Sequence, residues 1–333
     1  MKDIQYNAAN TRIRTYESSL FSNRDFEAWL GLNEADEIYA RLRETSYGDF
    51  IDEDSDVHDF EDVLLKEKKR IYEQMYSLAP DSRVVDLFTL KYDYQNLKLL
   101  VKADYMEQDF DEWLVPFGSK PLEVLKYLVR VRRSDQVAEQ MNACIQEVYE
   151  YIEGYQEIQD IDIIFDNHYW AHLRDITEEL DHPSFEKMYE RNIDIFNIST
   201  ALRSHLLGRK KGFISAVLVE GGSLSVEKLA DLLGHSLEDF FDYLKETAYR
   251  PLIEASYDEI VNQGTMETFD LLKDDFQMDR LKEQKIVPFG PAALVGYIFA
   301  KEMEIKNLRI LLISKINKIP EEVLRSKVRE SYV

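Results

Sequence analysis

The chain has 333 residues, of which 45% are apolar and 32% are charged, enough to build a substantial hydrophobic core in two or three domains. Lys and Arg number 41 against 64 Asp and Glu, which gives a formal net charge of −23. That charge repels nucleic-acid phosphates and anionic lipid head groups, so the composition argues against both as partners and favours proteins.

The remaining bulk features predict a soluble cytoplasmic protein. The single cysteine, Cys144, excludes an internal disulfide and indicates a reducing compartment, and its place in an apolar helical stripe predicts a core residue. The N-terminal stretch lacks the apolar segment of a secretory signal. The longest uncharged run, Ile286–Ala300, is interrupted by Pro and Gly and is too short to span a bilayer.

Helical signals follow one another along the chain. A helix is predicted to begin just after Pro121, and an amphipathic helical stripe covers residues 137–152. Ser236, with an acid three places on, predicts another helix start, and Gly234 predicts the end of the helix before it. Pro320 opens a last helix directed toward the C-terminus. Alternation of period two is almost absent, so the sequence predicts an all-α fold.

A short pattern, acid-x-x-Asn-[Leu/Ile], occurs three times, with its acids 101 and 110 residues apart. Its six polar residues are Asp93, Asn96, Asp194, Asn197, Glu304 and Asn307. A second echo pairs "LRETSY" at Leu42–Tyr47 with "LKETAY" at Leu244–Tyr249. Together the two echoes predict three degenerate copies of one helical unit, in residues 1–112, 113–212 and 213–333.

On a helix, the acid and the Asn of each copy share one face with apolar neighbours such as Leu97. A buried Asn costs free energy unless its amide is hydrogen-bonded. Its two donors and one acceptor can satisfy backbone groups of a loop or a helix end. We therefore interpret the motif as a structural staple at a helix junction, with a repeated ligand-binding or catalytic site as the alternative.

Three segments resemble a known family: "YDYQNLKLLVKA" at Tyr92–Ala103, "DIFNISTALRS" at Asp194–Ser204, and the C-terminal "AKEMEIKNLRILLISKINKIPEEVLRSKVRESYV". They are similar to the C-type subunits of V-type and A-type rotary ATPases, which are homologues of the d-type subunit in the eukaryotic vacuolar enzyme. "LRETSYGDFI", near the N-terminus, extends the resemblance over essentially the whole chain.

The resemblance implies a funnel of three similar helical subdomains around a pseudo-threefold axis. Such a protein is a non-catalytic part of the central rotor, present in one copy per complex and expected to be a monomer when isolated. It connects the central-stalk subunits, of D and F type, to the membrane proteolipid ring. It thereby couples ATP hydrolysis or synthesis to H⁺ or Na⁺ transport from a peripheral position on the cytoplasmic face of the membrane, without a cofactor.

Two other classes of function are alternatives. One is an unrelated all-helical repeat adaptor or scaffold, which would stack its units in an open solenoid. The other is a helical metalloenzyme, since His168 and His172 have the i, i+4 spacing of two zinc ligands. The Glu of H-E-x-x-H is replaced there by Tyr169, and the glycines around residues 208–212 lack phosphate-loop spacing. The sequence therefore predicts neither a metal site nor an enzyme.

Overall fold

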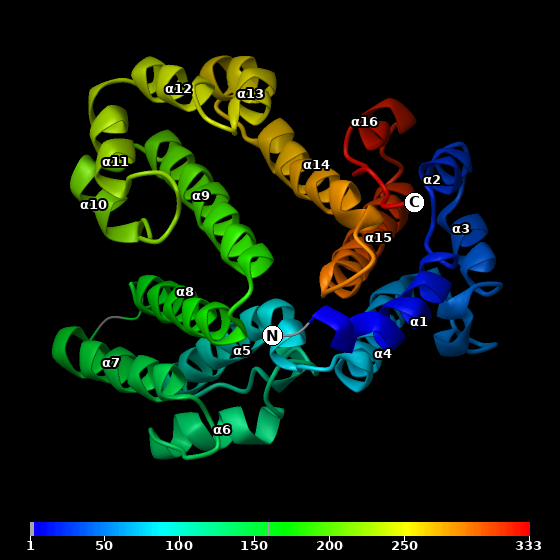
Figure 1. Ribbon diagram of the computed structural model, residues 1–333, viewed down its shortest axis with the longest axis horizontal. Coiled ribbons are helices and arrows are strands. Elements are labelled where there is room, and N and C mark those ends of the chain that lie inside the picture. The colour runs from blue at the N-terminus through cyan, green and yellow to red at the C-terminus, as the bar shows by residue number, and fades with distance from the viewer. Residues whose placement is uncertain (1–2, 157, 159) are drawn as a thin grey trace. The chain divides into compact units, whose positions relative to one another are not determined.

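The computed structural model describes residues 3–156, 158 and 160–333, and every regular element in that part of the chain is a helix (Figure 1). This confirms the all-α class predicted from the helical periodicity. The chain forms two compact units. One is Arg83–Ile253, and the other joins the chain up to Ser82 with Glu254–Val333. The finer division into three helical copies remains a prediction.

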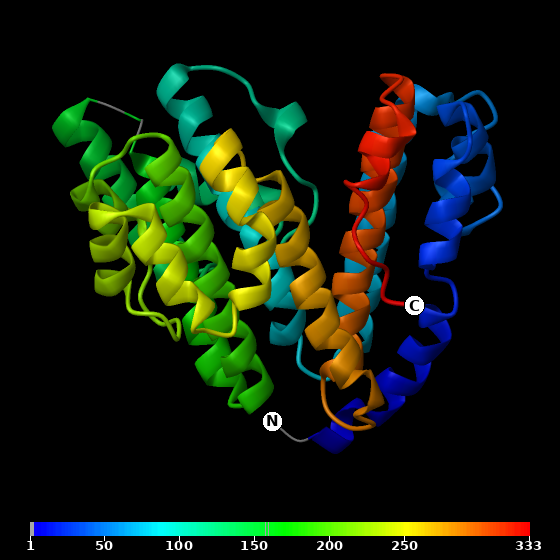
Figure 2. The same ribbon diagram turned by 90° about the horizontal axis from the view of Figure 1, so that it is seen from above.

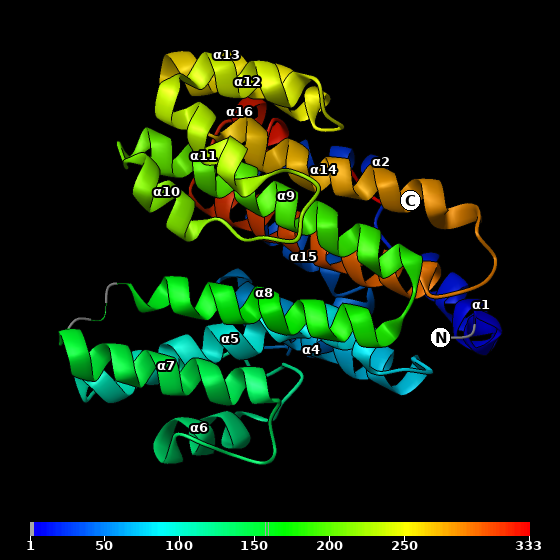
Figure 3. The same ribbon diagram turned by 60° about the vertical axis from the view of Figure 1, so that its left-hand side comes forward.

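The unit of Arg83–Ile253 is built around long helices that lie against one another, α5 on α8, α7 on α8, and α8 on α9 (Figure 3). Its elements are α5 (Arg83–Met106), the 3₁₀ helix η4 (Asp111–Trp113), α6 (Leu122–Val131), α7 (Glu139–Tyr155), α8 (Ile161–Leu180), α9 (Pro183–Leu206), α10 (Lys211–Val217), α11 (Val226–His235) and α12 (Leu237–Lys245).

The other unit is made from both ends of the sequence. Its N-terminal elements are η1 (Asp3–Tyr6), α1 (Asn7–Glu17), α2 (Asn23–Leu30), α3 (Ala35–Leu42), η2 (Ser46–Phe50), η3 (Val57–Asp59) and α4 (Phe60–Leu78). Its C-terminal elements are α14 (Glu267–Glu283), η5 (Gln284–Ile286), α15 (Ala292–Ile316) and α16 (Glu321–Arg325), preceded by the larger part of α13 (Arg250–Gln263).

Helix α15 is the centre of this second unit, because 18 of its 25 residues are buried. Helices α2, α3 and α4 pack their apolar faces against it in one core that includes Trp29, Leu42, Leu64 and Leu308. Figure 2 shows the N-terminal helices beside α15. A helix that is apolar on most sides must be covered on most sides, and the two ends of the sequence together provide that cover.

Helix boundaries agree with the sequence signals except at two points. Helix α6 begins directly after Pro121, and the Ser236 side chain accepts a hydrogen bond from the N–H three residues on. Gly234, however, lies inside α11, which continues to His235 and ends at an extended Ser236. The last helix, α16, stops at Arg325 instead of continuing toward the C-terminus, and the backbone of Arg329, four residues on, bonds to the Asn307 side chain.

Candidate functional site

The three copies of the acid–Asn motif lie on three long helices, α5, α9 and α15. All six polar side chains are buried, with no more than 4% of each residue exposed. Six polar groups cannot be held away from water without partners. The partners of each side chain therefore show what the motif does.

Each Asn side chain grips a single downstream backbone residue with two hydrogen bonds. The amide nitrogen donates to that residue's carbonyl, and the amide oxygen accepts from its N–H. The pairs are Asn96 with Val115 (3.0 and 2.9 Å), Asn197 with Val219 (2.7 and 2.9 Å), and Asn307 with Arg329 (2.9 and 2.9 Å). The amides thus fix three downstream segments to three helices in one geometry.

The acids of the first two copies bind the same segments slightly further along. Asp93 accepts from the N–H and the hydroxyl of Ser119, at 2.9 and 2.6 Å, and from the N–H of Lys120 at 3.3 Å. Asp194 accepts from the Ser223 hydroxyl at 2.5 Å and from the Leu224 N–H at 3.0 Å. Burial raises the pKa of Asp93 to about 6, against the opposing effect of the hydrogen bonds from Ser119 and Lys120.

A glycine precedes both Ser119 and Ser223, because the nearby carboxylate leaves no room for a side chain there. A Cβ at Gly118 would lie closer than 3.0 Å to Asp93 Oδ1, and a Cβ at Gly222 would lie equally close to Asp194 Oδ1. The loop can approach the carboxylate only without a side chain at that position. The Gly-Ser pair downstream of the acid is a repeated signal that our sequence reasoning missed.

The third acid, Glu304, obtains its partners from the N-terminal part of the chain. It accepts from the Phe21 N–H at 2.7 Å and from the Tyr47 hydroxyl at 2.7 Å. The residue four places after Arg329, where the first two copies have their serine, is Val333, which has no hydroxyl to donate. Phe21 lies two residues before a helix start, as do Lys120 and Leu224.

In the third copy, the N-terminal segment therefore donates to the acid, whereas in the other two copies the downstream loop does so. The second sequence echo supports this register. Tyr47 donates to Glu304, and Tyr249, at the same place in its echo, donates to Asp194 at 2.8 Å. In each of these two copies, one hydrogen bond therefore joins the tyrosine of the second repeated pattern to the acid of the first.

A buried ionic cluster surrounds Glu304 and was not expected from the sequence. Lys301 Nζ lies 2.7 Å from a Glu304 oxygen, 2.8 Å from a Glu67 oxygen and 4.7 Å from the centre of the Tyr47 ring. Arg70 pairs with the other oxygen of Glu67. Burial alone would lower the pKa of Lys301, but the Glu304 and Glu67 carboxylates outweigh it and raise that pKa. Burial and then Glu304 raise the pKa of Tyr47, which stays a donor.

The two candidate metal-binding histidines are engaged separately. His168 Nε2 lies 2.8 Å from a Glu147 oxygen, whereas His172 Nδ1 lies 3.3 Å from the Tyr94 hydroxyl. Burial, and then Lys120, lower the pKa of His172 to about 4, so the ring stays neutral. Over residues 3–156, 158 and 160–333, no group of three or more His, Cys, Asp or Glu side chains has the arrangement of a metal site.

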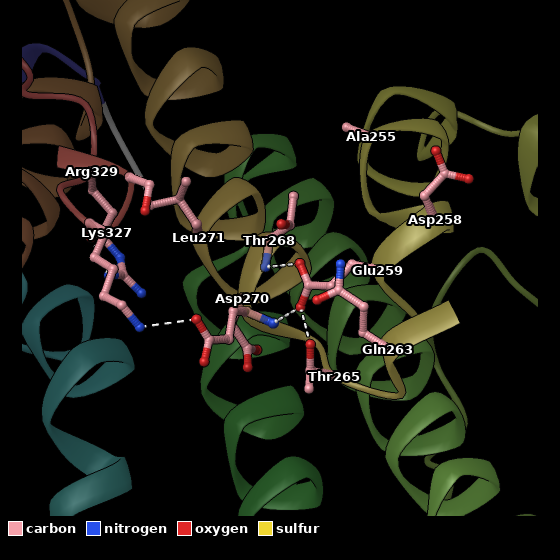
Figure 4. A pocket seen from close by; sticks show the side chains of 12 residues that line it. Ala255, Asp258, Glu259, Gln263, Thr265, Thr268, Asp270, Leu271, Lys327 and Arg329 are labelled. Carbon is pink, nitrogen blue, oxygen red and sulfur yellow. Dashed lines mark hydrogen bonds and ion pairs between the residues drawn. The ribbon is translucent and has the colours of Figure 1, made fainter. Parts of the chain in front are cut away.

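A groove of about 740 Å³ opens between α13, the start of α14 and the segment after α16 (Figure 4). Glu259 stands at its wall and caps α14, accepting from the N–H groups of Glu267 and Thr268 at 2.6 and 2.8 Å. Burial acts to raise the pKa of Glu259, but these bonds and the hydroxyls of Thr265 and Thr268 lower it. Lys327 crosses the groove to Glu267 at 2.9 Å. Acidic residues outnumber basic ones along the groove, so its electrostatic potential favours a cationic ligand.

The described part of the chain is thus a set of long helices locked by buried polar staples, the architecture of a helical structural subunit. The model of the family described as ATP synthase (C/AC39) subunit matches residues 9–327, and the chain belongs to this family.

Curated relatives agree with the family over nearly the whole length. The chain is 30% identical to the C-type subunit of the V-type sodium ATPase of Enterococcus hirae over 329 residues, 99% of each chain. It is 26% identical to the C-type subunit of the A-type ATP synthase of Methanocaldococcus jannaschii over 342 residues, 96% of this chain and 85% of that one. It is 25% identical to the corresponding protein of Thermococcus kodakarensis over 351 residues, 99% and 92% of the two chains.

The chain is therefore a non-catalytic subunit of a V/A-type rotary ATPase, and its partners lie within that membrane-associated complex. This membership decides against the unrelated scaffold and the metalloenzyme. None of the helices in the described residues has both the length and the apolar character needed to cross a bilayer. The uncharged run Ile286–Ala300 instead contributes an exposed loop and the buried first half of α15.

Proposed function

We propose that this chain is the socket of the rotor, which receives the foot of the central stalk on one side and binds the proteolipid ring on the other. Its three helical copies would form a funnel around a pseudo-threefold axis, one copy of the chain per complex. It would couple ATP hydrolysis or synthesis to H⁺ or Na⁺ transport at the cytoplasmic face of the membrane. The family match over residues 9–327 carries this proposal.

The buried staples support a role in transmitting torque. Apolar packing alone tolerates small sliding of one helix past another, whereas paired hydrogen bonds have one register. Each of α5, α9 and α15 is joined to a downstream segment by such a pair. A coupler needs this rigidity rather than a constellation of reactive groups.

Copurification tests the proposal most directly. A tag on this chain should bring down both stalk subunits and proteolipid from membranes solubilised in mild detergent. Membranes that lack the chain should still hydrolyse ATP at the head but lose ATP-driven ion transport. If the tagged chain arrives without either partner, the socket role is wrong.

The charge of the chain adds an electrostatic component. With a net charge of −23, the socket should attract basic residues on the stalk foot and speed assembly. Exposed charges are screened over about 10 Å at 0.1 M salt and about 3 Å at 1 M. Binding of the D- and F-type stalk subunits should therefore weaken as salt rises. Affinity that does not change with ionic strength would remove this component and leave the socket role untouched.

A further inference from the structure

A pocket of about 260 Å³ lies between α8, α9 and α10, within the unit of Arg83–Ile253 (Figure 3). We call it the α8–α10 pocket. An apolar cavity of about 150 Å³ is large enough to bind benzene. The α8–α10 pocket can therefore hold a compact apolar group together with a polar one. Its apolar lining consists of Ile163 from α8, Phe196 from α9, Leu207 just after α9, and Phe213 and Val217 from α10.

The two acidic residues that line the pocket already have cationic partners. Lys98 Nζ donates to Asp166 at 2.9 Å, and Lys102 Nζ donates to Asp162 at 3.1 Å. Both lysines belong to α5, so these pairs join α8 to its neighbour. The acids of the pocket are therefore used in packing the helices and do not call for a cationic ligand.

Arg209, which also lines the pocket, has a different surrounding. Its guanidinium lies over the Phe213 ring, 5.0 Å from the ring centre, and no carboxylate in the described part of the chain pairs with it. Contact with an aromatic face leaves the N–H groups at the edge of the guanidinium open to an acceptor. A second arginine, Arg203 on α9, lines the same pocket. The pocket thus joins an apolar lining to a guanidinium that can bind an anion.

The charges limit the kind of anion. A guanidinium forms strong paired hydrogen bonds with a carboxylate or a phosphate. Asp162 and Asp166 are about half exposed on α8, and they repel further negative charge even when they are paired. A dianionic phosphate ester is repelled more strongly than a single carboxylate. The pocket therefore favours an organic monoanion.

Helix α10 is where a ligand would change the protein. Ile214 is the one buried residue among the seven of α10, so the helix has few contacts of its own. Two residues beyond Val217 at its end lies Val219, the residue that Asn197 binds with two hydrogen bonds. A ligand in contact with Phe213 and Val217 would add apolar contacts to a weakly packed helix that leads into the second staple.

We propose that the α8–α10 pocket binds a small carboxylate with a compact aliphatic body, of the kind found in medium-chain fatty acids. The carboxylate binds Arg209, and the aliphatic body lies against Phe196, Phe213 and Val217. Binding holds α10 in place and stabilises the segment that Asn197 fixes to α9. This site is independent of the socket function, which the family match supports by itself.

The test measures binding of octanoate and of 1-octanol to the purified full-length chain. The reporter is Trp170, whose ring lies 5.2 Å from that of Phe196, in a background where Trp29 and Trp113 are replaced by Phe. Octanoate should change the Trp170 fluorescence saturably, with a Kd about tenfold below that of 1-octanol, because hydrogen bonds between charged groups are the stronger ones. Octanoate should also slow amide hydrogen exchange in Lys211–Val217.

Two variants separate the anionic from the apolar contacts. Arg209→Ala should raise the Kd for octanoate about tenfold and leave the Kd for 1-octanol unchanged. Phe213→Ala should raise both values, because both ligands lose an apolar contact. Lys210→Ala is the matched control: it removes one positive charge from an exposed neighbour that does not line the pocket, and it should change neither Kd.

The possible contrary results are distinct. No saturable signal at millimolar octanoate, together with unchanged exchange in Lys211–Val217, would show that the pocket does not bind this class of ligand. Equal affinities for octanoate and 1-octanol would overturn the anion site, as would octanoate binding to Arg209→Ala that matches the wild type. An equal loss of octanoate affinity in Lys210→Ala and Arg209→Ala would indicate diffuse attraction instead of a contact with Arg209.

Discussion

Removing the Glu304 side chain gives the sharpest test of how the N-terminal and C-terminal parts of the second unit are joined. In Glu304→Ala, the Phe21 N–H and the Tyr47 hydroxyl lose their acceptor, and Lys301 keeps only Glu67 as a counter-charge. A buried donor left without a partner costs about 1–3 kcal/mol. Breaking a buried ion pair completely costs about 3–5 kcal/mol, and Glu67 limits that part.

The expected loss is therefore about 3–5 kcal/mol of unfolding free energy, a large share of the 5–15 kcal/mol typical of a domain. Trp29 is a suitable reporter, because it is buried and its ring lies 4.7 Å from that of Phe21. The chain has 3 tryptophans, so the other two are replaced by Phe before urea unfolding is followed by fluorescence.

Glu61→Ala is the matched control in the same unit. Glu61 pairs with Arg309 at 2.8 Å, but half of its side chain is exposed. Exposed pairs contribute about 0–1 kcal/mol, so this variant should unfold almost like the wild type. A loss below about 1 kcal/mol for Glu304→Ala would refute the view that Glu304 clasps the N-terminal segment.

Three further predictions concern the other copies. Asp93 has a pKa raised from 3.8 to about 6, so the folded state holds its proton more tightly than the unfolded state. The stabilising contribution of this proton is present below pH 4 and is lost as pH rises through 6. The unfolding free energy of the wild type should therefore fall by up to about 3 kcal/mol relative to that of Asp93→Asn between pH 4 and pH 7, measured by urea unfolding. A difference between the two proteins that does not change with pH contradicts this prediction. Gly222→Ala should cost about 1–3 kcal/mol in thermal unfolding, because its Cβ would collide with Asp194, whereas Gly154→Ala, which meets nothing within 4 Å, should be neutral or stabilising. Asn197→Ala should cost about 2–3 kcal/mol and increase hydrogen exchange in the segment it grips, and unchanged exchange there would rule the staple out.

The helices and their buried faces were predictable, because periodicity is a local property of the sequence. The amphipathic stripe over residues 137–152 falls largely on α7, and burial of Asp93 and Asn96 beside Leu97 follows from their spacing on α5. The helix end predicted at Gly234 was wrong, because glycine permits a helix to end without requiring it to do so. Local sequence limits which backbone conformations a position can adopt, and tertiary packing determines which of them is found.

The contacts of the motif were less accessible, for two different reasons. The Gly-Ser pairs at 118–119 and 222–223 do recur at similar offsets after their acids, so a longer repeat search could have found them. The Lys301–Glu67 pair could not be found that way, because nothing marks Glu67 among 64 acidic residues. The bond from Phe21 to Glu304 uses a backbone N–H, which leaves no trace in side-chain identity.

The third copy differs from the other two in its acid, which is Glu rather than Asp, and in the source of the backbone N–H that this acid binds. In the first two copies the acid binds a loop that continues from the residue already bound by the neighbouring Asn, and Asp194 also accepts from the Tyr249 hydroxyl. In the third copy the acid holds two separate N-terminal segments at once. The longer Glu304 side chain reaches Phe21 and Tyr47 and still contacts Lys301 on its own helix. Hydrogen bonds and a buried ion pair there take the place of the covalently continuous loop of the other copies.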